Sequence, residues 1–397
     1  MSKGLLDGLK VLDMTRVLAG PYCGMLLADL GADVIKIEVP GRGDDARINF
    51  PIINGESAYF MNLNRNKRGI TLNLKTEKGK DIFRKLVAKS DVVLENYRPG
   101  VMEKLGLGYE ELRKINPGII YGAVSGFGHY GPYSQRPGYD IIGQAMSGLM
   151  STTGWPGGQP TRTGTAISDV MGGISCCVGI LAAYANKLRT GEGEKIDVSL
   201  VDSMVSSLEI INTIYLCTGK TPQRIGNRYE AIYPYDSFQA KDGMLVIGAG
   251  NQKLFTILCS IMKREDLLTD PQFADNNLRV INYAKLKPHI EAWLTDKTID
   301  EAVDILLKAG VPAAPINTID RVARDPHIAG ARKMFIEIEH PKAGKFKITG
   351  NQIKLTNHAI EHFTPAPLLG QHNEEILGEM LGLSHEEVCA LAEEKVL

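Results

Sequence analysis

The stretch Thr161–Gly173 (TRTGTAISDVMGG) places a single carboxylate, Asp169, between a polar loop and an apolar segment. A carboxylate in this position can act as a nucleophile. It can also be structural, because the Ser168 or Asp169 side chain can cap a helix by accepting a backbone N–H hydrogen bond. By itself, the stretch favours the structural interpretation, in which Ser168 or Asp169 caps the helix. The following residues, VMGGISCCVGILAAYANK, are apolar almost all round as far as Ala183, which predicts a buried helix.

Three other features could take part in chemistry. His129, in SGFGHYGP, has an ordinary pKa near neutrality and could act as a general base, although its glycine-rich surroundings are typical of a loop residue. Asp140 follows Pro137 by three residues and opens an apolar segment, where a cap is expected. The turn Gly248–Gly250 precedes a helical segment, so its backbone N–H groups could hold a carboxylate or simply form a tight turn.

Alternating strand and helix patterns position these residues. Short apolar runs predict strands at 9–14, 32–38, 69–74, 91–97 and 118–124, with helical patterns between several of them. This alternation predicts an α/β fold with a mostly parallel sheet, in which ligands bind beyond the carboxyl ends of the strands. The loop after the first predicted strand lacks GxGxxG, and the sequence has no GxxxxGK[ST], which disfavours nicotinamide and P-loop chemistry.

Cations gather in the loops at the expected strand ends. They are Arg16, Arg47, Arg65, Lys67, Arg68, Lys75 and Arg98. The acids near them in sequence are Asp44, Asp45 and Glu95, so the excess of positive charge would suit an anionic ligand such as a phosphorylated cofactor. An ordinary solvated rim of surface charge is the alternative.

Composition narrows the class of protein. A net charge of −1 over 397 residues argues against a nucleic-acid-binding face. The six cysteines are scattered without metal-ligand spacing, which predicts no metal site and is typical of a reduced, cytoplasmic protein. The sequence shows no uninterrupted apolar run of the about 18 residues that a membrane span needs, and MSKGLLDGLK lacks the apolar core of a signal peptide. We therefore expect a soluble cytoplasmic protein without membrane contact.

Several motifs in order resemble one family, the class III CoA-transferases, which include formyl-CoA, carnitine and bile-acid CoA-transferases. The motifs are LDGLKVLDMTRVLAGP at 6–21, NLNRNKRGITLNLK at 62–75, DVVLENYRPG at 91–100, GFGHYGP at 126–132, GYDIIGQAMSG at 138–148, the ISDVMGG segment and PAPLLGQHNEEIL at 365–377. The resemblance covers nearly the whole chain.

The resemblance implies that Asp169 is the nucleophile. Its carboxylate would attack an acyl-CoA thioester to give a mixed anhydride, then an aspartyl-CoA thioester, from which CoA passes to an acceptor acid. A helix N-terminus would keep Asp169 ionised, contributing about 0.3–1 kcal/mol. The small residues Gly164, Thr165, Gly172 and Gly173 would leave room for acyl groups.

The resemblance also implies a set of binding residues. CoA would be held by Val17, Leu18, Arg47, Leu72, Asn73, Leu74, Lys75, Asn96, Tyr97, Arg98, Lys104, Pro137, Gly138, Tyr139 and Asp140. Tyr139 and Asp140 would also line the substrate site, and Gly248, Ala249 and Gly250 would close over the aspartyl intermediates. Val39 stands where relatives often carry Arg, and Arg47 or Arg98 would compensate.

The acceptor is predicted to be a small carboxylic acid. The glycine turn is shorter than in formyl-CoA transferases, which disfavours formate and leaves oxalate or a succinate-like dicarboxylate as candidates. The main alternative function is that of the α-methylacyl-CoA racemases, which share the implied fold and place a catalytic histidine where this chain has Tyr139. Tyrosine, with a pKa near 10, is a poor proton acceptor at neutral pH, so the transferase is favoured. A non-catalytic CoA-binding protein is a third, weaker alternative, because the nucleophile is present.

The implied architecture is α/β: a Rossmann-like large domain with a parallel sheet, a smaller α+β domain and an interlocked homodimer. The large domain would comprise 1–200 and, after the chain returns to it, 326–397 with the C-terminal helices. The small domain would comprise 225–325.

Overall fold

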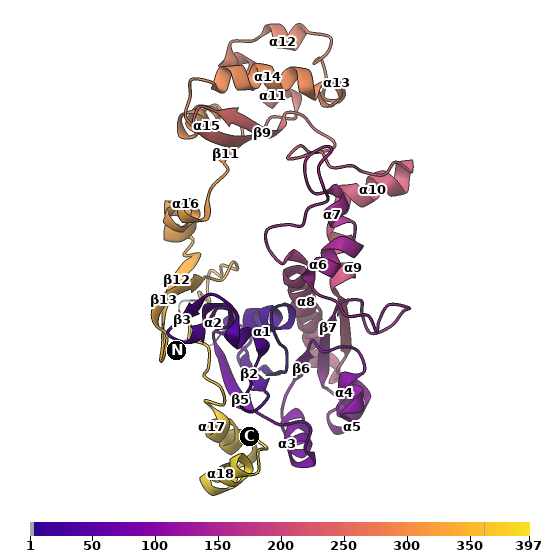
Figure 1. Ribbon diagram of the computed structural model, residues 1–397, viewed down its shortest axis with the longest axis vertical. Helices are drawn as coiled ribbons and strands as arrows, with labels where there is room; N and C mark the ends of the chain where they lie inside the picture. Colours follow the sequence, from indigo (N-terminus) through magenta and orange to yellow (C-terminus); the bar gives the residue numbers. More distant parts are fainter. Residues whose placement is uncertain (1–3, 361) are drawn as a thin grey trace. The chain divides into compact units, whose positions relative to one another are not determined.

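The computed structural model describes residues 4–360 and 362–397, which form two compact units. The first unit contains the chain up to residue 150, then 162–220 and 330–397. The second unit contains Ser151–Thr161 and Thr221–Ala329. The short segment Ser151–Thr161, which falls within the range expected for the large domain, therefore groups with the second unit (Figure 1).

A parallel sheet forms the centre of the first unit. Its strands, in spatial order, are β5 (Lys67–Thr71), β2 (Asp33–Glu38), β1 (Lys10–Asp13), β6 (Val92–Glu95), β7 (Ile120–Ser125) and β8 (Lys195–Ser199). Every neighbouring pair is parallel. Counted along the sheet, this is the 3-2-1-4-5-6 order of doubly wound folds. The strand order reverses between β1 and β6, and a ligand crevice is expected at their carboxyl ends.

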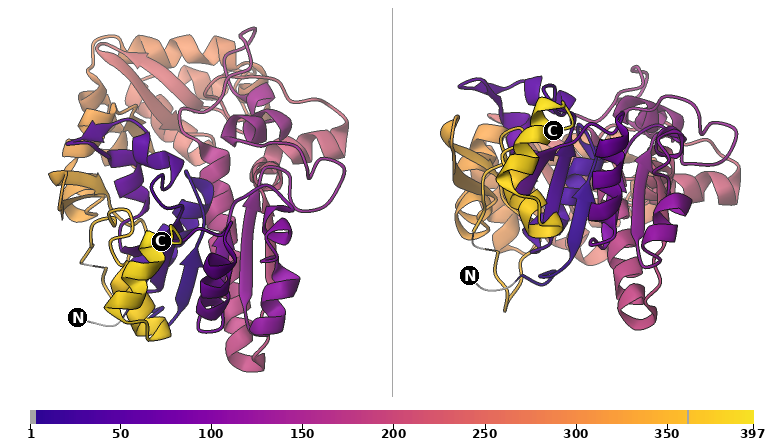
Figure 2. Two further views of the ribbon diagram at one scale, coloured as in Figure 1. Left: turned by 60° about the horizontal axis from the view of Figure 1, so that its bottom comes forward. Right: turned by 90° about the horizontal axis from the view of Figure 1, so that it is seen from below.

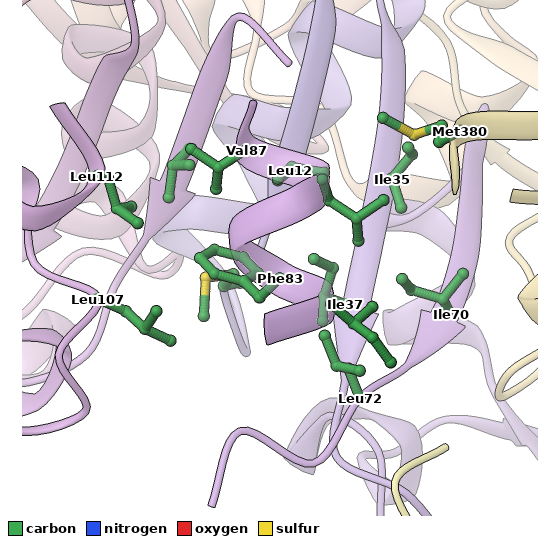
Figure 3. Packing of buried hydrophobic residues seen from close by; sticks show 14 of the residues in the cluster. Leu12, Ile35, Ile37, Ile70, Leu72, Phe83, Val87, Leu107, Leu112 and Met380 are labelled. Carbon is green, nitrogen blue, oxygen red and sulfur yellow. The ribbon is translucent and has the colours of Figure 1, made fainter. Parts of the chain in front are cut away.

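Alternating strand residues build a hydrophobic core on each face of the sheet. Leu12, Ile35 and Ile70 point to one face and pack against α3 (Glu77–Val87) through Phe83 (Figure 3). Their strand neighbours point to the opposite face and pack against α1 (Ala19–Asp29) and α8 (Ile167–Thr190). Because both faces are covered, most strand residues are apolar on both sides.

The remaining elements of the first unit surround this sheet. They are η1 (Asp45–Ile48), β3 (Ile52–Ile53), β4 (Glu56–Ser57), α2 (Ala58–Leu63), α4 (Val101–Lys104), α5 (Tyr109–Ile115), α6 (Asp140–Met146), α9 (Leu200–Ser207), α10 (Glu209–Thr218), β12 (Phe335–His340), β13 (Gly344–Thr349), α17 (Asn373–Leu381) and α18 (His385–Glu393). α7 (Leu149–Thr152) spans the boundary between the units. The C-terminal helix α17 lies beside β5 and α3 (Figure 2).

The second unit combines an antiparallel sheet with helices. The sheet order is β11 (Ala313–Pro315), β10 (Gly243–Gly248), β9 (Tyr235–Ala240). The helices are α11 (Gln252–Met262), α12 (Asp266–Thr269), α13 (Asn276–Ile281), α14 (Tyr283–Leu294), α15 (Ile299–Lys308), α16 (Ile319–Arg324) and the π-helical turn η2 (Pro326–Ala331), which ends just beyond the unit. The unit has its own hydrophobic core, centred on Phe238, Phe255 and Leu286.

Helix α8 is buried along one face, whereas its apolar sequence predicted burial almost all round. Gly172, Cys176 and Ile180 are buried in the core, but Val178 is 61% exposed. Within residues 4–360 and 362–397, α8 and the bent pair α9–α10 are long and apolar enough to cross a membrane. Core helices of soluble proteins meet the same criterion, and α8 packs closely against α1.

Candidate active site

A cleft of about 190 Å³ lies at the carboxyl ends of β1, β6 and β7, where the sheet topology predicts a ligand. Asp169 is part of its wall. The remaining lining residues come from the loops after these strands and from helix starts: Arg16, Val17, Leu18, Ala19, Asp45, Asn96, Tyr97, Arg98, Pro99, Val124, Ser125, Gly126, Arg136, Pro137, Gly138, Tyr139 and Leu200. The topology therefore brings Asp169 together with several of the residues predicted to bind CoA.

A buried ion pair supports the loop after β1. The Lys36 ammonium donates to Asp44 at 2.8 Å, and both side chains are fully buried. Burial favours the neutral forms, but each group's charge acts on the other, lowering the pKa of Asp44 and raising that of Lys36. Lys36 also donates to the Thr15 carbonyl, and Asp44 accepts the Val17 N–H at 3.1 Å. Val17 itself has a φ of 67°, a costly conformation for a β-branched residue that this network holds in place.

The loop after β6 is tied to the loop after β1. The Asn96 side chain accepts the Arg16 N–H at 2.8 Å and donates to the Arg16 carbonyl at 2.7 Å. The buried Glu95 carboxylate accepts the Tyr97 N–H at 2.7 Å. These bonds fix the backbone on both sides of the cleft.

Asp169 is the third residue of α8, which begins at Ile167 rather than after Asp169 as the sequence indicated. The N-cap residue is Ala166, which makes no side-chain capping bond. The missing cap comes instead from α6: Asp140 Oδ1 accepts the Ser168 N–H at 2.9 Å and the Ser168 hydroxyl at 2.8 Å. The capping interpretation of Ser168 and Asp169 is therefore wrong, because Asp140 fills that role and leaves the Asp169 carboxylate available to the cleft.

The electrostatic environment of Asp169 favours its neutral form. Burial raises the pKa of Asp169 to about 7, and the charge of Asp140 adds to the shift. A helix N-terminus contributes about 0.3–1 kcal/mol, less than one pKa unit, so it does not by itself keep Asp169 ionised. Near pH 7 about half of the Asp169 side chains are ionised at this pKa.

A second, larger cleft of about 750 Å³ begins where the first one ends, since Tyr97 lines both. Its walls are mostly apolar. They comprise Met14, Ile37, Glu38, Val39, Pro40, Gly41, Leu72, Asn73, Leu74, Lys75, Tyr97, Val101, Lys104, Leu105, Lys395 and Leu397. Three lysines at its edge, Lys75, Lys104 and Lys395, supply positive charge beside this apolar surface.

Comparison with known proteins identifies the family. The model of CoA-transferase family III matches residues 6–373. The chain belongs to this family. It is 44% identical to the acetyl-CoA:oxalate CoA-transferase of Acetobacter aceti, over 95% of this chain and 96% of the relative. It is 41% identical to the succinyl-CoA:glutarate CoA-transferase of Mus musculus, over 95% of this chain and 86% of the relative. A CAIB/BAIF family protein from Brucella suis has the same fold, with a TM-score of 0.84, 39% identity, and coverage of 96% of this chain and 100% of that one.

The family resemblance drawn from the motifs is thus confirmed, and the protein is a family III CoA-transferase. Of the residues predicted to bind CoA, the first cleft brings together Val17, Leu18, Asn96, Tyr97, Arg98, Pro137, Gly138 and Tyr139. The second cleft brings together Leu72, Asn73, Leu74, Lys75, Tyr97 and Lys104. Asp140 is buried behind the first cleft, where it also accepts a hydrogen bond from Gln144 at 2.7 Å.

Arg47 departs from its predicted place in this CoA-transferase. Its guanidinium donates to both oxygens of Glu38, at 2.7 and 2.6 Å, and to the Pro367 carbonyl at 3.1 Å. It also stacks on Phe60, 3.8 Å from the ring centroid. Arg47 itself lines neither cleft, but it contacts Glu38, which lines the second one. Arg98 lines the first cleft and Val39 the second, and compensation for Val39 by Arg98 stays a prediction.

Most of the other cations that the sequence assigned to an anionic ligand form ion pairs within the enzyme. Arg65 pairs with Asp29 at 2.6 Å and Lys67 with Asp13 at 2.8 Å, both fully buried. Arg68 pairs with three acids, Asp33, Glu375 and Glu379. The expectation that few acids face these cations was wrong, because the partners lie far away in sequence. Within the described part of the chain, Lys75 and Arg98 are the predicted cations that line a cleft without an ion pair to an acid.

The glycines after Asp169 also have a structural role. A Cβ on Gly173 would lie 2.5 Å from the Ala19 carbonyl oxygen, and one on Gly172 would lie 2.7 Å from Leu200 Cδ2. Both glycines allow α8 to approach α1 and α9 closely, so the space they leave is filled by protein rather than by an acyl group. Gly164 meets no atom within 4 Å and stays a candidate for that role.

His129 is buried outside the first cleft. Its Nδ1 lies 3.2 Å from the Lys195 ammonium, and its Nε2 lies 3.6 Å from Glu95. Burial and the charge of Lys195 lower the pKa of His129. The geometry therefore gives no support to His129 as a base acting on a substrate in this cleft.

Tyr59 was missed by the sequence analysis. Burial raises its pKa to about 12, with the charge of Asp169 as the next contribution. A tyrosine close to the nucleophile could have been noticed only as part of the aromatic pair Tyr59–Phe60.

The glycine turn lies in the second unit and follows β10. The Gly248 and Ala249 N–H groups donate to the Pro312 and Pro234 carbonyls, and Asn251 caps α11. These two donors are therefore occupied within the unit. Closure of the turn over Asp169 stays a prediction.

Within residues 4–360 and 362–397, no group of three or more His, Cys, Asp or Glu side chains is placed to hold a metal ion.

Proposed function

We propose that this enzyme transfers CoA from an acyl-CoA thioester to a small dicarboxylic acid through covalent intermediates on Asp169. The observation that carries the proposal is the position of Asp169, on the wall of a cleft at the topological switch point, with its helix capped by another residue. The names of the relatives, which act on oxalate and glutarate, support a dicarboxylate acceptor.

The chemistry proceeds in four balanced steps. The Asp169 carboxylate attacks the thioester carbon, the CoA thiolate leaves, and a mixed anhydride forms. The thiolate attacks the Asp169 carbonyl carbon, releasing the donor acid and leaving an aspartyl-CoA thioester. The acceptor carboxylate attacks this thioester and expels the thiolate, forming a second anhydride. The thiolate then attacks the acceptor's acyl carbon, which frees the new CoA ester and regenerates Asp169.

The two clefts support the placement of CoA. The apolar walls and the lysines Lys75, Lys104 and Lys395 of the second cleft suit the adenine and phosphates of CoA. Tyr97 joins this cleft to the first one, so the pantetheine arm would pass Tyr97 and deliver the thioester to Asp169. The proposed binding residues are those named above for each cleft.

We also propose that the enzyme acts as a homodimer. The α8 face opposite the core and the end of α10 carry exposed apolar side chains, including Val178, Tyr215 and Leu216. A homodimer would bury these apolar side chains, as protein interfaces do. Sedimentation equilibrium giving twice the chain mass is the expected result.

Covalent trapping tests the function. Wild-type enzyme is incubated with acetyl-CoA or succinyl-CoA and then treated with hydroxylamine or borohydride, and peptides are analysed by mass spectrometry. The adduct should lie on Asp169, and Asp169→Ala should lose transfer while still binding CoA. An adduct on another residue, or substantial turnover by Asp169→Ala, would refute the assignment. Deuterium exchange at the α-carbon of a branched acyl-CoA without an added acid would indicate a racemase instead.

A further inference from the structure

We propose that Arg16 binds the second, unreacting carboxylate of the dicarboxylate substrate and so selects dicarboxylates over monocarboxylates. The inference rests on the proposed function. It begins from the first cleft, whose wall contains both Asp169 and Arg16. A short diacid that presents one carboxylate to Asp169 leaves its other carboxylate within the same small cleft.

The guanidinium of Arg16 is only weakly engaged by the protein. Its polar contact within residues 4–360 and 362–397 is from Nη1 to Asp45 Oδ2 at 3.3 Å, and both side chains are about two-fifths exposed (42% and 40%). The other Asp45 oxygen accepts from Arg42 at 2.5 Å. Asp45 is therefore shared between two arginines, and Arg16 keeps most of its N–H donors free for a ligand.

The rest of Arg16 is held firmly. Its backbone N–H and carbonyl are both bonded to the Asn96 side chain. Its guanidinium carbon lies 5.1 Å from the centroid of the Tyr97 ring, which forms the wall between the two clefts. The planar Arg16 guanidinium presents several N–H donors, and the contacts above fix the residue that carries it. This arrangement is suited to bidentate recognition of a carboxylate.

The other arginines of the cleft are less suited to this role. Arg136 lies on an exposed loop and stacks on Tyr133, with its guanidinium carbon 3.6 Å from the ring centroid. Arg98 follows Tyr97, which also lines the second cleft, and is among the residues proposed to bind CoA. A dianionic substrate must also approach Asp169 and Asp140, so a cation near them offsets the repulsion.

The test compares acids of equal length that differ by one carboxylate. Butyrate and succinate, and pentanoate and glutarate, serve as acceptors with acetyl-CoA as donor, and CoA-ester formation gives kcat/KM for each. In Arg16→Gln the ratio of kcat/KM for the diacid to that for the monoacid should fall by about 10- to 100-fold, as expected for loss of a charged hydrogen bond. The fall should appear in KM of the diacid. Arg16→Lys, which keeps the charge without the fork, should recover part of the ratio.

Two variants control the interpretation. Asp45→Asn removes the internal competitor for Arg16, and KM of the diacid should fall while KM of the monoacid stays the same. Arg136→Gln removes the other exposed arginine, and the diacid-to-monoacid ratio should be unchanged. Because the Arg16–Asp45 pair is solvent-exposed, melting curves of the variants should match the wild type.

The outcomes separate the inference from the proposed function. Equal losses for both acids in Arg16→Gln, a rise in KM confined to acetyl-CoA, or a selective loss in Arg136→Gln would each overturn the role of Arg16. Wild-type enzyme that accepts only monocarboxylates would overturn it too, while leaving CoA transfer intact. Wild-type enzyme that forms no CoA ester from either donor, acetyl-CoA or succinyl-CoA, with any of the acids would refute the proposed function itself.

Discussion

Asp140 Oδ1 accepts the Ser168 backbone N–H at 2.9 Å, which joins the first turn of α6 to the first turn of α8. The bond gives Asp140 two effects on its neighbour Asp169. It fixes the helix start that carries Asp169, the proposed nucleophile, and its charge raises the pKa of Asp169. The two effects can be separated by substitution.

Asp140→Asn should move the acidic limb of the pH profile to lower pH. The amide oxygen can still accept the Ser168 N–H, but the negative charge that helps to raise the pKa of Asp169 is gone. In the wild type, kcat/KM should rise with pH through about 7, because only the ionised Asp169 attacks. An unchanged midpoint in Asp140→Asn would contradict this electrostatic role. Asp140→Ala instead leaves the Ser168 N–H unpaired and should lower the free energy of unfolding by about 1–3 kcal/mol.

Asp169→Asn should stabilise the fold at alkaline pH. The folded-state pKa of about 7 lies above the ordinary value of 3.8, so the folded protein binds this proton more tightly than the unfolded chain does. The protonated Asp169 side chain makes its full contribution to the stability of the folded state below about pH 4, and this contribution is lost as the pH rises through 7. The variant should therefore melt at a higher temperature than the wild type at pH 8, by a free energy of at most about 4 kcal/mol, and show little difference at pH 4. If the variant and the wild type differed more in melting temperature at pH 4 than at pH 8, the pH dependence would be opposite to the expected one and would contradict the prediction.

Gly173→Ala should destabilise the enzyme by about 1–3 kcal/mol, because its Cβ would stand 2.5 Å from the Ala19 carbonyl oxygen and force α8 away from α1. Gly164→Ala is the matched control, since its Cβ meets no atom within 4 Å. Urea unfolding of both variants measures the difference. Equal midpoints would show that the helices adjust without cost.

Lys36→Met should lower the free energy of unfolding by about 3–5 kcal/mol, because it leaves the buried Asp44 carboxylate without its cation. This loss in the free energy of unfolding should increase as the pH rises above the range in which a carboxyl group ordinarily titrates. Lys78→Met is the control: its pair with Glu394 is exposed, and its loss should cost less than about 1 kcal/mol. If the two variants proved equally stable, the loop after β1 would not depend on the buried pair.

Lys104→Ala should raise KM for the acyl-CoA donor by about tenfold and leave KM for the acceptor acid unchanged, because Lys104 lines only the second cleft. The wild-type KM for the donor should rise with ionic strength more steeply than that of the variant. Lys114→Ala, which removes an exposed pair with Glu111 on α5, should match the wild type in both constants. If Lys104→Ala changed only KM for the acceptor acid, CoA would have to bind outside the second cleft.

The sequence predicted the elements that depend on local pattern. Runs rich in apolar residues, such as Val11–Leu12 and Val34–Ile37, predicted β1 and β2, because a strand buried on both faces is mostly apolar. The ordered motifs identified the family, and with it the nucleophile to examine. By contrast, β5 begins at Lys67 rather than Gly69, since burial of Lys67 beside Asp13 lets a charged residue enter a strand.

Only the tertiary structure decided which charged groups are free to act. Arg65 meets Asp29 across 36 residues and Lys67 meets Asp13 across 54, whereas the partner of Arg16, Asp45, is exposed. Asp140 caps α8 from 28 residues away, so a role that the sequence gave to Ser168 or Asp169 belongs to another helix. The hydrophobic periodicity of a segment indicates which of its residues are buried, because the buried face of a helix or strand repeats with that element's own side-chain period. Pairing between elements depends on their order and register in the folded sheet, which no local pattern contains.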